Sequence, residues 1–300
     1  MDQIIRLFDQ PLLRARQRRA AALGPVTFLL ERVAEELAER LSAVLRRFEL
    51  AVDLGTPGDA VRRALAANAC LPTVFVAAHP LADLYPGTGP AVVAEAEALP
   101  FREGALDLIV SALALQWTDD LPGALAQIRR ALRPDGLFLA ALLGGDTLTE
   151  LRQSFAEAEA DTVGGASPHV APFADVRALG QLLQRAGFAL PVTDRERITV
   201  RYDNAFALFD DLRRMGATNV MRERSRRPLR RETLLRVAQI YAERFSDPDG
   251  RIRATFDVVW LSGWAPHASQ QQPLRPGAAS ARLADALKTK EMPAGEKPGQ

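Results

Sequence analysis

A short glycine-containing turn follows the first apolar strand pattern of the chain, and its residue types suit the binding of a nucleotide. The turn reads Val52-Asp53-Leu54-Gly55-Thr56-Pro57-Gly58-Asp59. In an open α/β sheet, the loop at the carboxyl end of the first strand approaches the ligand closely, which favours residues without a β-carbon. We therefore predict that a nucleotide binds against Asp53, Gly55, Thr56 and Gly58. The alternative is an ordinary turn, since Asp-x-Gly is common after strands.

Two further carboxylates are expected at such a site, one for the ribose and one for the base. The second strand pattern ends in Ala77-Ala78-His79, so the ribose acid is absent. The third leads into Glu95-Ala96-Glu97-Ala98-Leu99-Pro100-Phe101, where a carboxylate can accept a hydrogen bond from an adenine amino group. We predict that Glu95 and Ala96 contact the base and that Ser111, on the fourth strand pattern, completes the site. Alternatively, Glu95 is a solvated loop acid.

Three side chains outside the turn are candidates for catalysis. The pair Gln116-Trp117 follows the fourth strand pattern, at the edge of the sheet where a substrate would lie; alternatively, Trp117 packs beneath the next helix. His169 lies in a polar Gly-Gly-x-Ser-Pro-His loop. An imidazole there would titrate near neutral pH and could act as a general base, or it could simply orient the loop. Tyr202 ends a strand pattern and could reach a substrate, or it simply closes the strand.

The composition argues against several classes of site and partner. With Cys70 as the single cysteine, the chain can form neither an internal disulfide nor a thiolate metal cluster. The three histidines, His79, His169 and His267, are too far apart in sequence for a helical metal pair, so we expect no metal site. A formal net charge of +1, with no aromatic residues interleaved among the arginines, argues against nucleic-acid binding. No apolar run approaches the ~20 residues of a membrane helix.

The spacing of apolar residues predicts the elements that position these side chains. Val33, Leu37 and Leu41 recur at helical spacing and predict an amphipathic helix. Apolar runs predict strands at 48–54, 73–77, 91–95, 106–115 and 137–143. Because these runs are apolar throughout, the strands belong in a parallel sheet that is covered on both faces.

The second half of the chain adds a helix, two strands and a helical insertion. The helix over 175–186 stops at Gly187, 197–202 alternates like an edge strand, and 254–264 is a last strand. The insertion carries an arginine loop, residues 222–231, whose charge is either solvated or docks an acidic protein partner. We predict an N-terminal helical extension (1–47), a main domain (48–276) with a helical lid at about 204–250, and a disordered tail (277–300).

Several motifs together resemble class I S-adenosylmethionine-dependent methyltransferases. The order of elements is similar, and so is the series LPF…DLIVS…W…DLP…I…LRPDG between residues 99 and 136. More specific motifs resemble the family of mitochondrial complex I assembly factor 5 and its bacterial relatives. They lie at 144–152, 164–169, 185–188 and 211–219, and in the closing Gly263-Trp264…His267…Ser269-Gln270. The resemblance runs from about Phe8 to about Ala286. The malonyl-acyl-carrier-protein O-methyltransferase of biotin synthesis is a more distant relative.

The resemblance implies an α/β fold with a doubly wound, mostly parallel sheet of seven strands, N-terminal helices and a helical lid insertion. It implies that the residues above bind S-adenosylmethionine. It also implies a protein partner, the iron–sulfur subunit of NADH:quinone oxidoreductase (complex I), on which the assembly factor is credited with hydroxylating an arginine. Methyl transfer can proceed by holding the reacting atoms in line, without an obvious base. Because the resemblance begins near Met1, we expect no presequence and a bacterial cytoplasmic protein, peripheral to the inner membrane through its partner.

The chain departs from the family at the cofactor turn. The family pattern Asp-x-Gly-x-Gly-x-Gly is one residue shorter here, Pro57 removes an N–H donor, and the ribose acid is absent. Two other functions therefore stay open. One is an O-methyltransferase for a small-molecule or acyl-carrier substrate, and the other is a cofactor-free pseudoenzyme that acts as an assembly chaperone.

Overall fold

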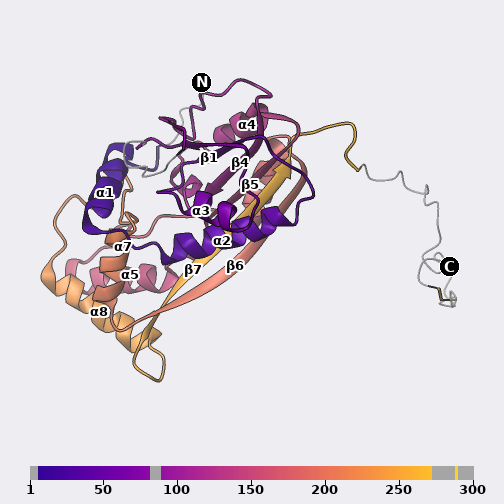
Figure 1. The fold of residues 1–300 in the computed structure, drawn as a ribbon. Helices are drawn as coiled ribbons and strands as arrows, with labels where there is room; N and C mark the ends of the chain where they lie inside the picture. Colours follow the sequence, from indigo (N-terminus) through magenta and orange to yellow (C-terminus); the bar gives the residue numbers. More distant parts are fainter. Residues whose placement is uncertain (1–5, 82–88, 272–287, 290–300) are drawn as a thin grey trace, which may run out of the picture. The chain divides into compact units, whose positions relative to one another are not determined.

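The computed structural model describes residues 6–81, 89–271, 288 and 289 (Figure 1). The α-helices in this part of the chain are α1 (Gln10–Leu23), α2 (Phe28–Ser42), α3 (Ala60–Ala67), α4 (Leu121–Ala131), α5 (Thr149–Val163), α6 (Val176–Arg185), α7 (Ala205–Arg214) and α8 (Arg231–Phe245). The strands are β1 (Leu50–Leu54), β2 (Val74–Ala78), β3 (Ala91–Val92), β4 (Leu106–Ala112), β5 (Leu132–Leu143), β6 (Ala189–Tyr202) and β7 (Ile252–Trp264). The described residues divide into two units, one that ends at Pro266 and one that begins at His267.

The described strands form a seven-stranded sheet in the order β3-β2-β1-β4-β5-β7-β6. Neighbouring strands from β3 to β5 pair in parallel, whereas β7 pairs antiparallel with both β5 and β6. The strand order reverses between β1 and β4, and in such a sheet ligands bind outside the carboxyl ends of the strands at this point. The predicted doubly wound, mostly parallel sheet of seven strands is confirmed.

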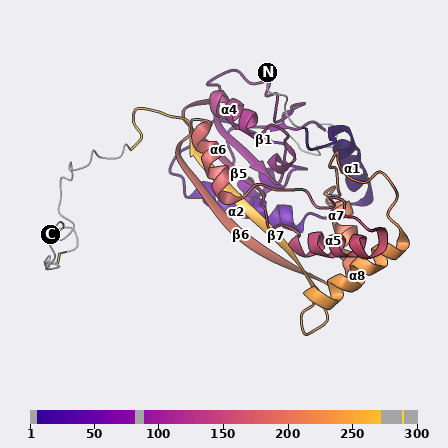
Figure 2. The ribbon, with the colours of Figure 1, turned by 180° about the vertical axis from the view of Figure 1, so that it is seen from behind.

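Helices cover both faces of the sheet, as the fully apolar strands require. Helices α2 and α3 pack on one face, where Val33, Leu37 and Leu41 are buried (Figure 1). Helices α4 and α6 pack on the other face, with Leu179 and Leu183 of α6 buried (Figure 2). The predicted amphipathic stripes are therefore the surfaces that cover the sheet.

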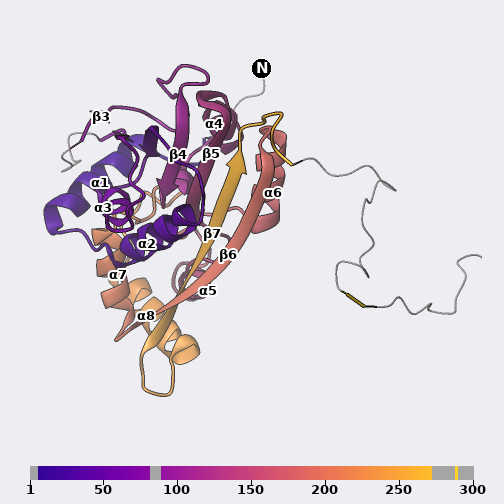
Figure 3. The same ribbon diagram turned by 45° about the vertical axis from the view of Figure 1, so that its right-hand side comes forward.

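A further core lies where β6 and β7 extend beyond the rest of the sheet (Figure 3). Helices α5, α7 and α8 pack together there around buried residues such as Leu208 and Tyr241. The Tyr241 hydroxyl donates to the Arg253 carbonyl at 2.9 Å, which ties α8 to β7. This cluster forms one side of the cavity described below.

The N-terminal segment (residues 7–23) contacts parts of the chain that are distant in sequence. Phe8 is 2% exposed and forms an isolated bridge with Met221. The backbone amides of Leu7 and Phe8 both donate to Asp119 Oδ1, at 2.8 and 2.9 Å. Helix α1 then packs against α7. Residues 7–23 therefore lie against segments that are far along the chain, at Asp119, Met221 and α7.

Three strands differ clearly from the sequence prediction. β6 begins at Ala189, eight residues before the expected start at Arg197. β3 has two residues, whereas a run over 91–95 was expected. β5 begins at Leu132 rather than after the turn Pro134-Asp135-Gly136, which lies within the strand as an irregularity. Asp135 has a φ of +65°, and the β4–β5 register shifts between Leu106 and Leu108. The strand absorbs the turn because Leu132 still pairs with Leu106 ahead of it.

The predicted division into extension, main domain, lid and tail stays a prediction. The tail (277–300) lies outside the described residues except for residues 288 and 289. In the second unit, His267 Nδ1 and Ser269 Oγ are 2.7 Å apart.

Candidate functional site

Asp53 is a buried carboxylate near the carboxyl end of β1. The residue is only 2% exposed, and within the described residues neither carboxylate oxygen has a hydrogen-bond partner. Burial raises its pKa to about 7, although the nearby Thr56 hydroxyl and Arg62 guanidinium act to lower it. A buried acceptor of this kind is costly unless a donor reaches it. The position fits a site that a ligand completes.

The turn after Asp53 is held by bonds between β1 and β4. Thr56 Oγ1 accepts from the Ala112 amide at 2.9 Å, and Ser111 Oγ donates to the Leu54 carbonyl at 2.7 Å. Gly55 has a φ of +77°, and a β-carbon there would lie 3.0 Å from the Ala114 β-carbon. Thr56 and Ser111 thus shape the turn, and their hydroxyls are already engaged within the protein.

Beyond Gly55, the turn opens onto a cavity. Gly58 has a φ of +72°, and a β-carbon at this position would meet no atom within 4 Å. Both Pro57 and Gly58 line the cavity. The backbone at Gly58 therefore leaves open space beside the cavity.

His79, which stands in place of the ribose acid, and Glu95, the predicted base-binding acid, each contact another residue of the protein. His79 follows β2, and its Nδ1 accepts from the Leu81 amide at 2.9 Å. Glu95 forms an ion pair with Arg14 of α1, 81 residues away in sequence. Burial raises the pKa of Glu95, and Arg14 acts in the opposite direction. Neither Glu95 nor Ala96 lines the cavity.

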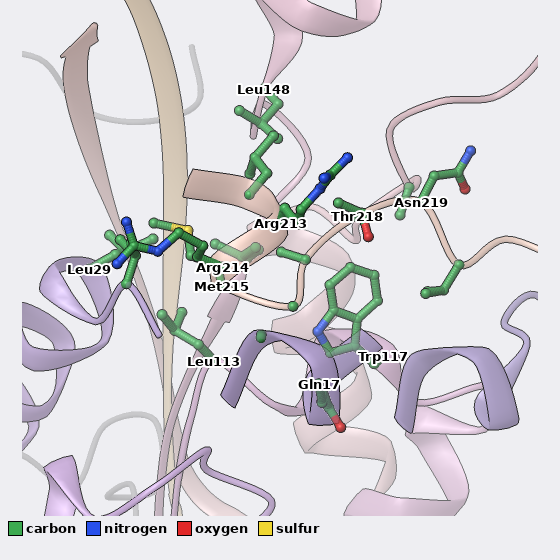
Figure 4. Close-up of a pocket in the computed structure, with 18 of the residues that line it drawn as sticks. Gln17, Leu29, Leu113, Trp117, Leu148, Arg213, Arg214, Met215, Thr218 and Asn219 are labelled. Carbon is green, nitrogen blue, oxygen red and sulfur yellow. The ribbon is translucent and has the colours of Figure 1, made fainter. Parts of the chain in front are cut away.

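The cavity has a volume of about 640 Å³ and lies between the strand ends, α1, α2, α5 and the segment from α7 to Val220 (Figure 4). Its wall is mostly apolar and includes Leu29, Leu113, Leu148, Leu151, Phe155, Phe173, Phe209, Leu212 and Met215. Polar lining residues include Gln17, Gln116, Arg213, Thr218 and Asn219. An apolar cavity with a few polar groups is the usual form of a small-molecule or side-chain binding site.

Trp117 lines this cavity and is held on two sides by aromatic rings. Its ring meets Phe8 edge-to-face at 5.6 Å and Phe173 at 6.0 Å between centroids. Figure 4 shows the Trp117 ring beside Gln17 of α1 in this view. Trp117 therefore packs against Phe8 of the N-terminal segment, rather than beneath the next helix, and forms part of the cavity wall; its contact with a substrate stays a prediction.

His169 also lines the cavity, in contact with Glu159 and Ser167. Its Nε2 is 2.8 Å from Glu159 Oε1 and 3.2 Å from Ser167 Oγ, and its ring stacks on Phe155 at 3.8 Å between centroids. Burial would raise the pKa of Glu159, but hydrogen bonds from His169 and Ser167 lower it below its ordinary value.

This arrangement is not a serine–histidine–acid relay. In a relay, the serine and the acid contact opposite ring nitrogens, whereas here both face Nε2. With Nε2–H donating to Glu159, the second nitrogen, Nδ1, keeps a lone pair that can accept a proton.

Tyr202 lies away from the cavity. Its residue is 8% exposed, it belongs to the core around α5, α7 and α8, and burial raises the pKa of its hydroxyl. The structure thus brings Gly58, Trp117 and His169 to one cavity. Asp53, Gly55, Thr56 and Ser111 lie at the adjoining strand ends, and Glu95, Ala96 and Tyr202 do not line the cavity.

Several cavity residues were not proposed as site residues from the sequence, although Gln116 was expected beside Trp117 at the edge of the sheet. Gln116 has a buried Oε1 without a hydrogen-bond partner among the described residues, and its Nε2 donates to the Leu113 carbonyl at 2.7 Å. Leu113 itself has a φ of +51° and lines the cavity. Arg213, Thr218 and Asn219 belong to a motif that carried the family resemblance, but only the fold shows that this segment reaches the strand ends.

The described residues also limit two other kinds of site. Within 6–81 and 89–271, no helix combines the length and the apolar character needed to cross a membrane. In the same part of the chain, no group of three or more His, Cys, Asp or Glu side chains is placed to hold a metal ion.

Comparison with known proteins identifies the family. Residues 53–140 match the family model described as a methyltransferase domain. The chain is 38% identical to "Arginine-hydroxylase NDUFAF5, mitochondrial" of Mus musculus over 302 residues, which cover 98% of this chain and 87% of that protein. It is 42% identical to a malonyl-[acyl-carrier protein] O-methyltransferase of Laribacter hongkongensis over 186 residues, which cover 62% of this chain and 60% of that protein.

A solved structure shares the fold. The YcgJ protein of Bacillus subtilis superimposes with a TM-score of 0.52 at 14% identity, covering 77% of this chain and 98% of that one. The match to NDUFAF5 over nearly the whole chain confirms the resemblance found in the motifs. This chain therefore belongs to the NDUFAF5 family, within the class I S-adenosylmethionine-dependent methyltransferase superfamily.

Proposed function

We propose that the protein binds S-adenosylmethionine at the carboxyl ends of β1 and β4 and modifies a side chain of a partner protein. The observation that carries this proposal is Asp53, a buried carboxylate without a partner in the described residues, at the base of a turn that opens onto the 640 Å³ cavity. The cofactor's amino and hydroxyl groups are donors of the kind that this carboxylate lacks.

The residues present fit the cofactor. Asp53 would accept from it, and the positive-φ backbone at Gly55 and Gly58 would let it approach the turn. The ion pair with Arg14 uses Glu95 Oε1, so Oε2 is left for the base. When bound, S-adenosylmethionine supplies an electrophilic methyl group.

The remaining cavity residues would hold the group to be modified. His169 can take a proton at Nδ1 while Glu159 holds its Nε2–H, and Gln116 offers a buried carbonyl oxygen. The mostly apolar wall excludes water, and Trp117 borders the entering group. The helical insertion over 204–250 would act as the lid, because α7 contributes Phe209 and Leu212 to this wall.

The proposed partner is the iron–sulfur subunit of NADH:quinone oxidoreductase. The support is the relation to NDUFAF5, which extends over 98% of the chain, whereas the relation to the acyl-carrier methyltransferase covers 62%. The proposed setting is the cytoplasm of a bacterium, with the protein bound at the inner membrane only through this partner. A second candidate, O-methylation of an acyl-carrier substrate, is favoured by the apolar character of the cavity.

The test is incubation with the purified iron–sulfur subunit and methyl-labelled S-adenosylmethionine, followed by mass spectrometry of the subunit. The proposal predicts a labelled methyl group on one side chain, and the loss of that label in Asp53→Asn. Asp59→Asn is the matched control, because Asp59 lies in the same loop but is ion-paired with Arg63.

Each other outcome contradicts the proposal in a distinct way. An added oxygen without label would assign the reaction named for NDUFAF5 instead of methyl transfer. Label on an acyl-carrier substrate alone would favour the second candidate. Binding of the subunit without any mass change would leave the chaperone interpretation.

A further inference from the structure

A second cavity, of about 580 Å³, lies beside the first and is lined by arginines. Its arginines come from α1 and from the loop before α8: Arg16, Arg224, Arg226, Arg227 and Arg230. Two acids share the lining, Asp9 and Glu159. The arginine loop (222–231) therefore forms one wall of a cavity. From the sequence alone, its charge was expected either to be solvated or to dock an acidic protein partner.

The positive charge of this arginine cavity is not balanced within the protein. Asp9 is paired with Arg224 at 3.1 Å, and Glu159 is held by His169. Among the described residues, Arg226, Arg227 and Arg230 have no ion pair. Burial, followed by repulsion from Arg19 and Arg224, lowers the pKa of Arg16. The five arginines outnumber the two acids in the lining, and this excess of positive charge favours a multiply charged anion.

The arginine cavity and the apolar cavity share one wall. His169, Asn219 and Leu229 line both. Elsewhere along the boundary, two adjacent residues of one helix line different cavities. On α1, Gln17 lines the apolar cavity and Arg16 the arginine cavity, and on α8 Leu234 and Thr233 divide in the same way. A cationic cavity that suits an anion therefore adjoins an apolar one.

We infer that the two cavities together bind a phosphate ester carried on an apolar chain. Guanidinium groups match phosphate through paired N–H donors, which accounts for the arginines at one end. The leucine- and phenylalanine-lined wall accounts for the chain at the other. This inference concerns binding alone and does not depend on the proposed methyl transfer.

Calorimetric titration of the full chain with octyl phosphate tests the inference. Octyl phosphate should bind at least about tenfold more tightly than inorganic phosphate, because the chain removes apolar surface from water. It should also bind more tightly than octyl glucoside, which has the same chain and no charge. Equal affinity for octyl phosphate and either reference compound would overturn the inference.

Variants separate the two ends of the site. Arg226→Ala and Arg230→Ala should each weaken octyl phosphate and inorganic phosphate by about tenfold, as loss of a charge-assisted contact predicts. Arg231→Ala is the matched control, since Arg231 is exposed, lies next to Arg230 and does not line the cavity. Ala21→Phe, on the exposed part of α1 that lines the apolar cavity, should weaken octyl phosphate but not inorganic phosphate.

Two results would contradict a specific phosphate site in the arginine cavity. An equal effect of Arg231→Ala and Arg226→Ala would mean diffuse attraction. Tighter binding of an acidic peptide through the same arginines would assign a protein-docking surface instead. The source of the ester is decided with vesicles. Binding to neutral vesicles only after phosphatidic acid is added supports a lipid headgroup, and binding of octyl phosphate but not of vesicles supports a soluble phosphate carrier.

Discussion

Replacing Asp53 by asparagine should remove a pH dependence from the stability of the protein and weaken its binding of S-adenosylmethionine. The carboxylate is 2% exposed and unpartnered within the described residues, and burial raises its pKa to about 7. Asparagine has nearly the same shape but does not ionise. The substitution therefore isolates the electrostatic cost of keeping this acid at the strand end.

The magnitude follows from the two pKa values. The folded value of about 7 exceeds the ordinary value of 3.8 by about 3 units, and each unit corresponds to about 1.4 kcal/mol. Ionising Asp53 therefore costs the folded state about 4 kcal/mol. Between the two pKa values, the folded state holds a proton that the unfolded state has lost, so the free energy of unfolding falls as the pH rises and levels off above about 7.

Urea unfolding at about pH 5 and about pH 8 measures this effect without cofactor. The Asp53 contribution to the free energy of unfolding should fall by about 2 to 3 kcal/mol between these pH values. The free energy of unfolding of the wild-type protein should therefore fall by this amount more than that of the Asp53→Asn variant over the same pH range. Asp59→Asn, which removes a carboxylate ion-paired with Arg63 from the same loop, should keep the wild-type pH dependence.

The reasoning would be refuted by equal pH dependence in the wild type and Asp53→Asn. That result would mean that water or another group already satisfies the carboxylate. If Asp53→Asn is more stable at about pH 8 but binds the cofactor with the wild-type affinity, the cost of ionising Asp53 is confirmed and its role in binding is contradicted.

Three other changes test parts of the framework. Thr56→Val should lower the free energy of unfolding by about 1 to 3 kcal/mol in urea, because the buried Ala112 amide loses its acceptor; full stability would mean that another group replaces the hydroxyl. Gly55→Ala should cost more than about 1 kcal/mol, whereas Gly164→Ala, at a similar φ of +73° with open space around it, should cost less; equal costs would exclude the contact with Ala114. Phe8→Ala should cost about 3 kcal/mol, because the ring is buried; an unchanged unfolding midpoint would show that the N-terminal segment is not part of the cooperative fold.

The sheet and its covering helices could be predicted because their signals are local. Leu37 and its neighbours recur at helical spacing and are buried against the sheet. Gly187 was expected to end a helix, and it has the positive φ of +84° that such an ending favours. The turn at Asp135 misled the prediction, because turn residues can also be accommodated as an irregularity inside a paired strand.

The candidate site was predicted less completely because it depends on contacts between distant residues. Arg14 pairs with Glu95, 81 residues away, and the segment just before Arg14 is bound to Asp119; neither contact has a signal in the sequence. The stacking of His169 on Phe155 joins a loop to a helix with no periodic signal. The sequence also could not show that the arginine loop and α1 enclose a second cavity, since that depends on how the segments pack.

Calorimetric titration of the wild-type protein with S-adenosylmethionine and S-adenosylhomocysteine tests the central claim most directly. Both ligands should bind at one site, Asp53→Asn should weaken their binding, and Asp59→Asn should leave it unchanged. Absence of binding at millimolar ligand would contradict the account and leave a methyltransferase fold that works without its cofactor.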